Sequence, residues 1–446
     1  MFARKIYQEL KAWKDTKAGE HALMIEGPRR VGKSTILEEF VKNEYKTYIF
    51  IRFEAVNDEI KALFGNLFNL NRFFLLLQQY FHVRLYERMS AIVFDEVQLH
   101  PLARQAIKTL VNDGRYDYYE TGSLISIRKN VKDILIPSEE DTIQMHPMDF
   151  EEFLWAMGDE MSMLLIRDSF ETLTPLGDGL HGHMMDLYRT YMVVGGMPKA
   201  VARFVERNSF AAAEDVKRSI LNLYVKDAAK LDADTGSSRA TAVLRALPSN
   251  LERHDKAFSP GSVKKDSAFR DYRRAISELQ DSMMVNICCR ITEPAVDQEN
   301  HCDHDDLKMY LCDTGLLFTQ SFNALKLDSD EVYRSILNGE MGINQGMYFE
   351  NMVAQELVMS GHKLFFSKFP HEDSEKLQEV DFVTVRGRST VVIEVKSGKR
   401  PKMHKSLDRY MDKFGDRTGT AYVVCNRDLE VCGDLVYLPI YMASLL

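Results

Sequence analysis

The sequence predicts an α/β protein, and three stretches carry that prediction. An apolar run at 22–26 leads into a glycine-rich loop at 27–34, after which the apolar residues have helical spacing. A second apolar run, 91–94, ends in two adjacent carboxylates, as buried parallel strands do where they meet a ligand. The third stretch, 379–396, has two β-branched runs joined by a glycine turn, which is typical of a β-hairpin.

Length and composition fit a protein of several domains. A chain of 446 residues suggests about two to four domains with sizeable cores. The formal net charge of −9 excludes a surface covered with positive charge, so any contact with nucleic acid has to come from local basic patches. The N-terminus is amphipathic without the apolar core of a signal peptide, and the most apolar stretch, 73–77, is much shorter than a membrane span. We therefore expect a cytoplasmic protein without membrane contact.

The cysteines indicate reduced thiols. The chain has 6 cysteines, and none of them forms a C-x-x-C pair, so a disulfide framework is not expected. His301-Cys302-Asp303-His304 contains side chains that zinc prefers, but no second cluster has a matching spacing. We interpret these four residues as a polar loop.

The glycine-rich loop fits the pattern G-x-x-x-x-G-K-[ST] at every fixed position. In the order strand, loop and helix, backbone N–H groups surround the β- and γ-phosphates of a nucleotide, and glycines let the main chain come close. Lys33 adds a positive charge toward the γ-phosphate, and the Ser34 hydroxyl is placed to bind Mg²⁺. An ordinary glycine turn is the weaker alternative because both flanks are correct. The predicted ATP-binding residues are Gly27, Pro28, Arg29, Arg30, Val31, Gly32, Lys33, Ser34, Thr35 and Asp95.

Asp95 and Glu96 end the second apolar run. In enzymes with such a phosphate loop, the first carboxylate orients Mg²⁺ and its waters, and the second polarises the attacking water. We therefore assign Asp95 to Mg²⁺ together with Ser34, and Glu96 to catalysis of ATP hydrolysis. A strand that ends in a solvated Asp-Glu turn would be the better interpretation without the phosphate loop upstream.

Residues 116–121 form the next predicted strand, although it is more polar than buried strands usually are. Its end offers Thr121 or Ser123 as a sensor of the γ-phosphate. Arg115 and Arg128 are candidates for an arginine that stabilises transition-state charge. Because exposed arginines are common, neither of the two is assigned.

The middle of the chain is predicted to be mostly helical from 151 to 231. Gly195-Gly196-Met197-Pro198 interrupts this pattern as a helix-terminating turn, and 232–238 is a plausible hinge. Three helical segments and a two-stranded ribbon follow, which is consistent with a winged helix-turn-helix. Its basic residues either contact DNA phosphates or solvate a helix face, and both interpretations stay open. These residues are Lys264, Lys265, Arg270, Arg273 and Arg274.

The C-terminal hairpin brings two acids together. With a two-residue turn at Gly387, the register places Asp381 opposite Glu394, with Cβ atoms about 5 Å apart, which is destabilising unless something neutralises the charges. The neighbouring residues are apolar on both faces, so we expect the sheet to be buried on both sides. A divalent cation resolves the conflict: Asp381 and Glu394 would bind Mg²⁺, and Lys396 on the Glu394 face would position a hydroxide.

Two features adjoin this hairpin. Residues 396–413 contain 7 lysines and arginines against 2 aspartates, which suits a phosphate backbone, although a solvated helix face is the alternative. The acids themselves have an alternative interpretation as a satisfied charge cluster, or as a decayed site that binds without cutting.

Taken together, these motifs resemble a family of prokaryotic AAA+ ATPases, over nearly the whole chain. The resemblance implies a P-loop AAA+ parallel-sheet domain, a helical and winged-helix middle, and a C-terminal restriction-endonuclease-like α/β domain of the PD-(D/E)xK superfamily. In that superfamily a glutamate on a preceding helix often completes the site; Glu350 matches it, and we expect it at the rim of its helix. The motifs that carry the resemblance lie at 27–34, 95–98, 121–123, 146–153, 191–198 and 308–317.

The predicted domains are a nucleotide-binding domain at 1–155, a helical domain at 156–238, a winged helix at 239–330 and a nuclease-like domain at 331–446. We expect a protein that binds and hydrolyses ATP with Mg²⁺, coupled to DNA binding or to Mg²⁺-dependent phosphodiester cleavage. The alternative is a nucleotide-controlled interaction switch whose nuclease-like domain binds DNA or protein without cutting. The predicted catalytic residues are Glu96, Glu350, Asp381, Glu394 and Lys396.

Overall fold

The computed structural model describes residues 2–122, 138–233, 238–322, 330–337, 345–371, 374–398 and 402–446. Ser123, Arg128 and two basic residues at 399 and 400, all named in the predictions above, lie outside these ranges. The chain divides into two compact units, Met1–His146 and Pro147–Leu446. Among the described residues, no helix combines the length and the apolar character that crossing a membrane requires.

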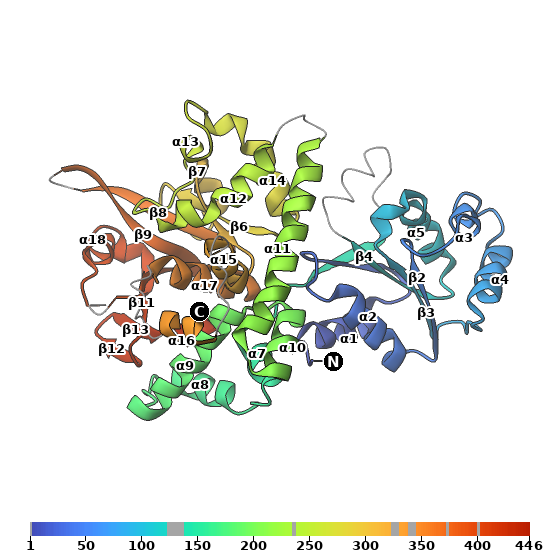
Figure 1. Ribbon diagram of the computed structural model, residues 1–446, viewed down its shortest axis with the longest axis horizontal. Coiled ribbons are helices and arrows are strands. Elements are labelled where there is room, and N and C mark those ends of the chain that lie inside the picture. The colour runs from blue at the N-terminus through green and yellow to red at the C-terminus, as the bar shows by residue number, and fades with distance from the viewer. Residues whose placement is uncertain are drawn as a thin grey trace. The chain divides into compact units, whose positions relative to one another are not determined.

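A five-stranded parallel sheet forms the centre of the N-terminal unit (Figure 1). Its strand order is β2-β3-β4-β1-β5. The strands are β1 Ala22–Glu26, β2 Thr47–Arg52, β3 Ser90–Asp95, β4 Asp117–Gly122 and β5 Glu140–Gln144. The predicted parallel sheet is therefore confirmed. The strand that precedes the glycine-rich loop, β1, and the strand that ends in Asp95, β3, both pair with β4, which lies between them.

Helices cover both faces of this sheet. One hydrophobic cluster packs Leu23 and Ile25 of β1 against α1 and α2, and the other packs Met24 against α3, α4 and α5. Successive residues of a strand point to opposite faces, so a strand that is covered on both sides reads as a continuous apolar run. The helices are α1 Ile6–Lys17, α2 Lys33–Glu44, α3 Asp58–Leu63, α4 Leu70–Phe81 and α5 Pro101–Asp113, with the 3₁₀ turn η1 at Val97–Leu99.

An eight-stranded mixed sheet forms the core of the C-terminal unit, in the order β12-β13-β11-β10-β9-β8-β6-β7. Its strand β6 pairs antiparallel with β7 and parallel with β8. The ribbon that we predicted for a winged helix is thus continuous with the predicted nuclease-like hairpin, across the domain boundary that we predicted at 330. The strands are β6 Val285–Ile291, β7 Cys302–Leu311, β8 Leu364–His371, β9 Ser374–Arg386, β10 Ser389–Lys396, β11 Thr418–Cys425, β12 Glu430–Cys432 and β13 Leu435–Pro439.

The hairpin of β9 and β10 has the predicted register. Gly387 in its turn has a φ of 64°. Pairing runs from Arg386 with Ser389 to Phe382 with Ile393, and one further step places Asp381 beside Glu394. Helix α17 (Gly346–Met359) packs on β10, and α18 (Lys405–Phe414) packs on β9 and β11, so both faces are covered.

The other helices of this unit follow the predicted order. The helical stretch expected from 151 to 231 runs from α7 to α11, and the turn at 195–198 ends α9 and begins α10, as predicted. Three helices precede the β6–β7 ribbon, although α13 has only four residues. The helices are α7 Phe150–Ala156, α8 Ser162–Thr172, α9 Asp178–Val194, α10 Pro198–Arg207, α11 Phe210–Ala233, α12 Arg239–Glu252, α13 Pro260–Val263, α14 Arg273–Asp281, α15 Thr314–Ser321 and α16 Asp330–Leu337, with 3₁₀ turns η2 Phe269–Asp271, η3 Gln298–His301, η4 Gly415–Arg417 and η5 Ile440–Leu445.

Candidate functional site

The glycine-rich loop connects the C-terminal end of β1 to the N-terminus of α2. Within it, Arg30 and Gly32 have φ values of 71° and 103°, in the left-handed region. Left-handed residues in a loop are typical of the concavity in which successive backbone N–H groups bind an anion. The first turn of α2 adds the positive end of the helix dipole. The loop therefore has the backbone shape that binds phosphate.

The Lys33 side chain is buried against this loop. Its Nζ donates to the carbonyl oxygen of Gly27 at 2.8 Å and to that of Pro28 at 3.1 Å. Burial lowers the pKa of Lys33 to about 8, although the nearby carboxylates of Glu96 and Asp95 act in the opposite direction. The ammonium is therefore held at the phosphate loop in an environment where a further negative charge stabilises it.

Asp95 accepts hydrogen bonds from two hydroxyl groups, which come from two neighbouring elements. Ser34 Oγ, at the start of α2, donates to Asp95 Oδ1 at 2.6 Å, and Thr121 Oγ1, near the end of β4, donates to the same oxygen at 2.6 Å. A hydroxyl and a carboxylate are hard oxygen ligands of the kind that Mg²⁺ prefers. The donor set of Ser34 and Asp95 thus fits Mg²⁺. Thr121, a predicted sensor candidate, contacts the carboxylate that we predicted to bind Mg²⁺.

Glu96 leaves the strand in a left-handed conformation, with a φ of 55°. Its backbone N–H donates to Thr121 Oγ1 at 3.1 Å, and its carboxylate accepts a hydrogen bond from Gln98 Nε2. We assigned no role to Gln98 from the sequence, because a contact between residues two apart depends on the 3₁₀ turn that starts at Val97. The carboxylate is thus oriented by its own loop.

The glycine-rich loop is also held by the segments that follow β5 and precede α1. A Cβ atom on Gly27 would lie 2.3 Å from the carbonyl oxygen of Met145, so only glycine fits there. Arg4, which we did not predict, donates to the carbonyl oxygens of Val31 at 3.2 Å and His146 at 2.7 Å. The predicted ATP-binding residues that are exposed are Arg29, Arg30 and Thr35.

The unexpected polarity of β4 is explained by buried ion pairs. Glu120 is fully buried, and Arg104 lies 3.1 Å from its carboxylate and 2.8 Å from that of Glu140. Burial and the neighbouring Glu140 raise the pKa of Glu120, and Arg104 opposes this shift. Arg115, a candidate for transition-state charge stabilisation, instead lies 2.7 Å from Asp113.

The second candidate site is a group of acids and lysines in the C-terminal unit, which we call the acid–lysine cluster. Its carboxylates come from α17, β9 and β10, and its ammonium groups from β7, β8, β10 and the segment before α13. Asp255 and Asp306 adjoin the group, each 3.3 Å from Lys368 Nζ. The cluster consists of Glu350, Glu379, Asp381, Glu394, Lys256, Lys308, Lys368 and Lys396.

Asp381, Glu394 and Lys396 lie together in the structure. Lys396 Nζ is 2.5 Å from Glu394 Oε1, and Asp381 Oδ2 accepts a hydrogen bond from the Val395 N–H at 2.8 Å. Burial and the Asp381 carboxylate raise the pKa of Glu394 to about 7. Among the described residues, the second oxygen of Glu394 is buried without a hydrogen-bond partner. An orphaned carboxylate oxygen beside a second carboxylate is a donor set that fits Mg²⁺.

Glu350 is not at the rim of its helix, where we expected it. Its side chain is 1% exposed, Tyr310 OH donates to Oε1 at 2.5 Å, and Lys256 contacts Oε2. The expectation was wrong because it assumed a helix with one exposed side. Helix α17 is instead buried on all sides, from Met347 to Leu357.

Lys308 lies at the centre of the cluster and is fully buried. Its Nζ is 2.5 Å from Glu379 Oε1, 3.2 Å from Glu350 Oε1 and 3.8 Å from Asp381 Oδ1. Burial alone lowers the pKa of Lys308, but the charges of Glu379 and Asp381 outweigh it and raise the pKa above its ordinary value. The sequence did not indicate this residue, because β7 belongs to the ribbon that we assigned to another domain.

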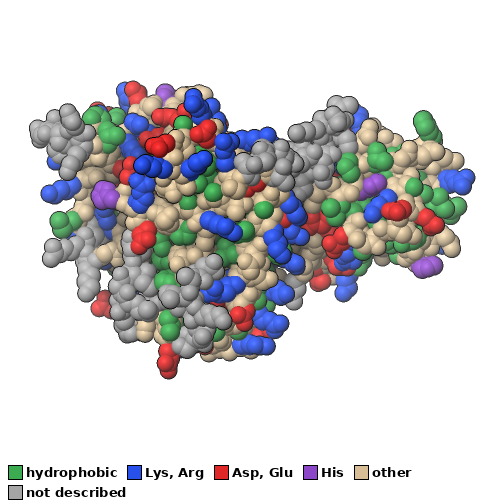
Figure 2. All heavy atoms as spheres, turned by 45° about the horizontal axis from the view of Figure 1, so that its top comes forward, with side chains coloured by type: hydrophobic (Ala, Val, Ile, Leu, Met, Phe, Trp, Pro, Cys, Tyr) green, Lys and Arg blue, Asp and Glu red, His purple; other side chains and the backbone are tan. Residues whose placement is uncertain are grey.

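Some of the predicted basic residues are exposed on α18, and others form ion pairs. On α18, Lys405, Arg409 and Lys413 are exposed. In the predicted winged helix, Arg273 lies 2.7 Å from Asp305, and Arg274 Nε lies 3.0 Å from Glu278. Basic side chains form several separate groups on the face seen in Figure 2, with acidic side chains between them.

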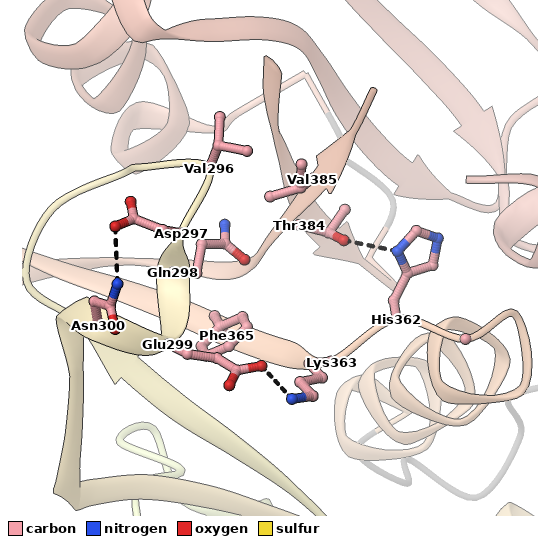
Figure 3. Close-up of a pocket in the computed structure, with 11 residues that line it drawn as sticks. Val296, Asp297, Gln298, Glu299, Asn300, His362, Lys363, Phe365, Thr384 and Val385 are labelled. Carbon is pink, nitrogen blue, oxygen red and sulfur yellow. Dashed lines mark hydrogen bonds and ion pairs between the residues drawn. The ribbon is translucent and has the colours of Figure 1, made fainter. Parts of the chain in front are cut away.

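A pocket of 410 Å³ opens elsewhere in the C-terminal unit (Figure 3). Polar groups on its wall bind one another: Thr384 Oγ1 lies 3.0 Å from His362 Nδ1, and Lys363 pairs with Glu299. Burial lowers the pKa of His362, and Arg386 lowers it further. None of the predicted site residues lines this pocket, so we assign it no function.

Comparison with known proteins identifies the N-terminal domain. Residues 19–154 match a family model described as an AAA domain. Residues 185–330 and 345–442 match two models described as domains of unknown function, DUF8612 and DUF4143, and the eight-stranded sheet takes strands from both. The AAA-type ATPase domain with nucleotide binding and hydrolysis is thus confirmed. The winged helix, the nuclease-like fold and their ligands stay predictions.

Solved structures resemble the chain only distantly. The Walker-type ATPase PABY2304 of Pyrococcus abyssi is 14% identical, with a TM-score of 0.42, over 72% of this chain and 96% of that one. The ORC1 protein of Aeropyrum pernix in complex with DNA is 13% identical, with a TM-score of 0.26, over 76% and 93%. At such scores these likenesses carry no argument about function. No curated protein matches this chain.

Proposed function

Starting from an AAA-type ATPase domain at residues 19–154, we propose that this protein hydrolyses ATP and that its C-terminal unit binds DNA and cleaves phosphodiester bonds. The first part of the proposal rests on the convergence of Lys33, Ser34 and Asp95 at the end of β1 and β3. The second part rests on the buried, unpartnered oxygen of Glu394 beside Asp381.

In ATP hydrolysis, the loop N–H groups and Lys33 bind the phosphates and neutralise charge that develops on the γ-phosphoryl group. Ser34 and Asp95 would hold Mg²⁺, which would supply positive charge beside the phosphates. Glu96 accepts hydrogen bonds from the attacking water and aligns it with the γ-phosphorus. Gln98 positions this carboxylate, as its hydrogen bond to Glu96 indicates.

The ATPase is tested with two substitutions at the same site. We expect Lys33→Ala to abolish ATP binding, because it removes the only side-chain cation that the motif directs at the γ-phosphate. Glu96→Gln should keep ATP binding and lower turnover by about 10²–10⁴-fold, the usual contribution of a catalytic base. The measurements are phosphate release and equilibrium binding of a fluorescent ATP analogue.

The exposed Glu54→Gln is the matched control for this pair, since it makes the same chemical change away from the loop. It should keep both binding and turnover. Unchanged turnover in Glu96→Gln would remove Glu96 from its role, and tight ATP binding by Lys33→Ala would contradict the assigned phosphate site.

At the acid–lysine cluster, Asp381 and Glu394 would hold a divalent cation against the scissile phosphate. A cation held there would supply Lewis acidity toward a phosphodiester and an attacking water. Lys396, which is partly exposed and hydrogen-bonded to Glu394, is placed to orient the attacking hydroxide and to stabilise the phosphorane-like charge. Glu350 binds Lys308 and Tyr310 and in this proposal acts through them.

One observation favours a second candidate function, binding without cleavage. Lys308 Nζ lies 3.8 Å from Asp381 Oδ1, and this lysine is fully buried beside it. A protein cation can therefore compensate Asp381 without a metal ion. In this alternative the unit binds DNA or protein under control of the nucleotide state.

Cleavage assays distinguish the two candidates. Plasmid and oligonucleotides are incubated with Mg²⁺ or Mn²⁺, with and without ATP, using wild type, Lys396→Ala and the control Lys402→Ala. Lys402 is a neighbouring lysine that pairs with Glu430 outside the cluster. We expect Lys396→Ala to lose at least about 100-fold in cleavage rate and Lys402→Ala to cut normally. Wild type that cuts no faster than Lys396→Ala but still binds DNA would establish the second candidate.

A further inference from the structure

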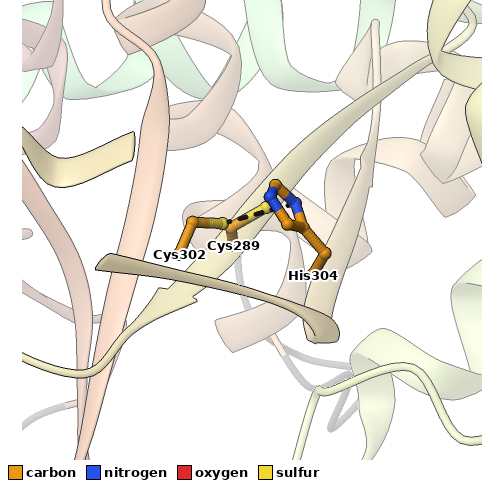
Figure 4. A group of neighbouring side chains, drawn as sticks. All are labelled: Cys289, Cys302 and His304. Atoms are coloured by element: carbon orange, nitrogen blue, oxygen red, sulfur yellow. Dashed lines mark hydrogen bonds between the residues drawn. The ribbon is translucent and has the colours of Figure 1, made fainter. Parts of the chain in front are cut away.

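Three soft metal ligands meet where β6 and β7 pair. One ligand atom each from Cys289, Cys302 and His304 lies within 4.8 Å of the other two (Figure 4). Cys302 Sγ and His304 Nδ1 are 3.7 Å apart. In contrast to the neighbouring Cys288, which is fully buried, Cys289 and Cys302 are partly exposed, and His304 is exposed.

A β-bulge creates this arrangement. Cys289 pairs with Leu307, but the next residue of β6, Arg290, pairs with Asp303, so residues 304–306 of β7 lie outside the strand pairing with β6. Bulges bend a strand and change the direction in which its side chains point. Cys302 and His304 are two residues apart on β7, a spacing that places residues on the same face of a strand. Cys302 pairs with Ile291 of β6, which is two residues from Cys289, so this pairing brings the two β7 residues beside Cys289.

We propose that Cys289, Cys302 and His304 form a site for a thiophilic metal ion, with Zn²⁺ as the expected occupant. Two thiols and an imidazole are ligands that zinc accepts in tetrahedral sites, whereas Mg²⁺ requires oxygen. Zn–S bonds of about 2.3 Å and Zn–N bonds of about 2.0–2.1 Å place a sulfur and a nitrogen about 3.6 Å apart in a tetrahedron. The 3.7 Å between Cys302 and His304 matches that separation.

The exposure of His304 determines whether water can reach the fourth ligand position of the site. Three protein ligands leave a fourth position, and with His304 at the surface this position is open to water. The ion would connect β6 to the part of β7 that the bulge separates from it. Since the site uses neither the phosphate loop nor the acid–lysine cluster, it is independent of the function proposed above.

Cobalt substitution tests the site in the full-length protein. Protein that has been reduced and freed of metal is titrated with Co²⁺, and thiolate-to-cobalt charge-transfer absorption and the d–d bands of tetrahedral Co²⁺ are recorded. We expect one equivalent to bind, Zn²⁺ to displace it, and Cys302→Ser to weaken binding and lower the charge-transfer absorption, because it removes one of the two thiolates. His304→Ala should weaken binding at least about tenfold, since it removes one of three protein ligands.

Two control variants keep the test specific. Cys432→Ser removes an exposed thiol outside the group, and His301→Ala removes a neighbouring imidazole that lies beside Asp297. Both should bind Co²⁺ as wild type does. Thermal unfolding with and without Zn²⁺ should show stabilisation of wild type and a smaller stabilisation of His304→Ala, a substitution at an exposed position that leaves the fold intact.

The proposal fails if wild type shows no charge-transfer absorption, or if Cys302→Ser and His304→Ala bind Co²⁺ as tightly as wild type. Lys33→Ala and Lys396→Ala should keep full Co²⁺ binding. This result separates the metal site from the ATPase and from the acid–lysine cluster, so the failure of one leaves the others standing.

Discussion

Lys33 combines burial with a charge that the phosphate loop requires. Its pKa of about 8 means that the free protein loses this proton within the range of ordinary buffers. A bound phosphate stabilises the ammonium and raises the pKa again. We therefore expect ATP affinity to be constant below pH 8 and to fall by up to about tenfold per pH unit above it.

The measurement is equilibrium binding of a fluorescent ATP analogue from pH 6.5 to about 9.5 at constant ionic strength. Lys33→Arg is the matched variant, because a guanidinium keeps its charge over this range and removes the pH dependence. Wild-type affinity that stays constant through pH 8 and beyond would contradict the lowered pKa.

In the acid–lysine cluster, the raised pKa of Glu394 predicts how the free energy of unfolding depends on pH. Its pKa is raised from 4.5 to about 7 in the folded protein, so folding is favoured by the bound proton. This contribution is fully present below pH 4.5 and is lost as the pH rises through 7, and it amounts to about 3 kcal/mol at most. Glu394→Gln should lack this dependence, because the amide does not titrate.

Urea unfolding of wild type and Glu394→Gln between pH 4.5 and 7.5 measures the difference. Wild type should lose stability relative to the variant as the pH rises. Under the proposed metal site, Mg²⁺ at pH 7.5 should restore stability to wild type and leave Glu394→Gln unchanged. Parallel pH curves for the two proteins would show that folding does not raise the pKa of Glu394.

At the scale of single residues, the sequence predicts the residues whose positions a motif specifies. It misses residues whose role depends on a contact that forms only in the folded protein. Lys33, Ser34 and Asp95 follow from spacing alone, and the structure brings them together. Gln98 and Lys308 act through contacts that no spacing encodes: one depends on a 3₁₀ turn, and the other depends on a strand pairing between distant segments.

Among the elements, the turn between α9 and α10 is joined to the start of α15. Asp313 is fully buried, and its carboxylate accepts hydrogen bonds from the N–H groups of Gly196 at 2.6 Å and Leu316 at 2.8 Å. A Cβ atom on Gly315 would lie 2.6 Å from the Cα atom of Gly195. The backbones of the two segments therefore approach so closely that only glycine fits.

We expect Gly315→Ala to lower the free energy of unfolding by roughly 1–3 kcal/mol, the usual cost of overpacking a rigid contact. Gly182→Ala on α9 is the control, since no atom of the described residues, apart from its chain neighbours and the nearby backbone of its own helix, lies within 4 Å of its Cβ position. Alanine there should be neutral or stabilising by up to about 1 kcal/mol through helix propensity. Thermal or urea unfolding compares the variants, and equal stability of Gly315→Ala and wild type would contradict the close approach.

Local pairing is predictable at the scale of elements, and distant pairing is not. The turn at Gly387 fixed the register of β9 and β10, because a two-residue loop determines which residues face each other. Nothing in β6 indicates that β8 is its parallel neighbour, since a β-branched strand pairs equally well with many partners. The periodicity of α17 was also misleading, because a helix buried on all sides has no polar face to locate.

For the whole molecule, the net charge of −9 confines any DNA contact to local groups of basic residues. Lys405, Arg409 and Lys413 are exposed at four-residue spacing along α18, and so lie on one side of the helix. If this side binds phosphates, replacing all three with glutamine should weaken DNA binding. The slope of log K against log salt should then fall by about 0.9 for each phosphate that the variant no longer neutralises.

A double variant, Arg273→Gln with Arg274→Gln, is the comparison for this triple variant. Both arginines are paired with acids, so their removal should change the salt slope less than removal of the α18 residues. Fluorescence anisotropy with an oligonucleotide over a salt series gives the slopes. An unchanged slope in the triple variant would exclude α18 as the phosphate-binding element.

The position of the AAA domain was accessible from the sequence, but the pairing of strands across residue 330 was not. The AAA domain match at 19–154 agrees with the position of the phosphate loop. The remainder forms one compact unit from Pro147 to Leu446, whose sheet combines strands from both sides of the predicted boundary at 330. The amino-acid sequence around residue 330 does not indicate that strands before and after it belong to one sheet.

The pairing of β6 with β8 has a consequence for synthesis on the ribosome. Residues 288–291 hydrogen-bond with residues 364–367, so the ribbon leaves the ribosome well before its neighbour exists. At about 5–20 residues per second, the nascent chain exposes an unpaired strand edge for several seconds. Chains that end between these segments should therefore aggregate, and a chaperone that shields the β6 edge would raise the yield of the full-length protein.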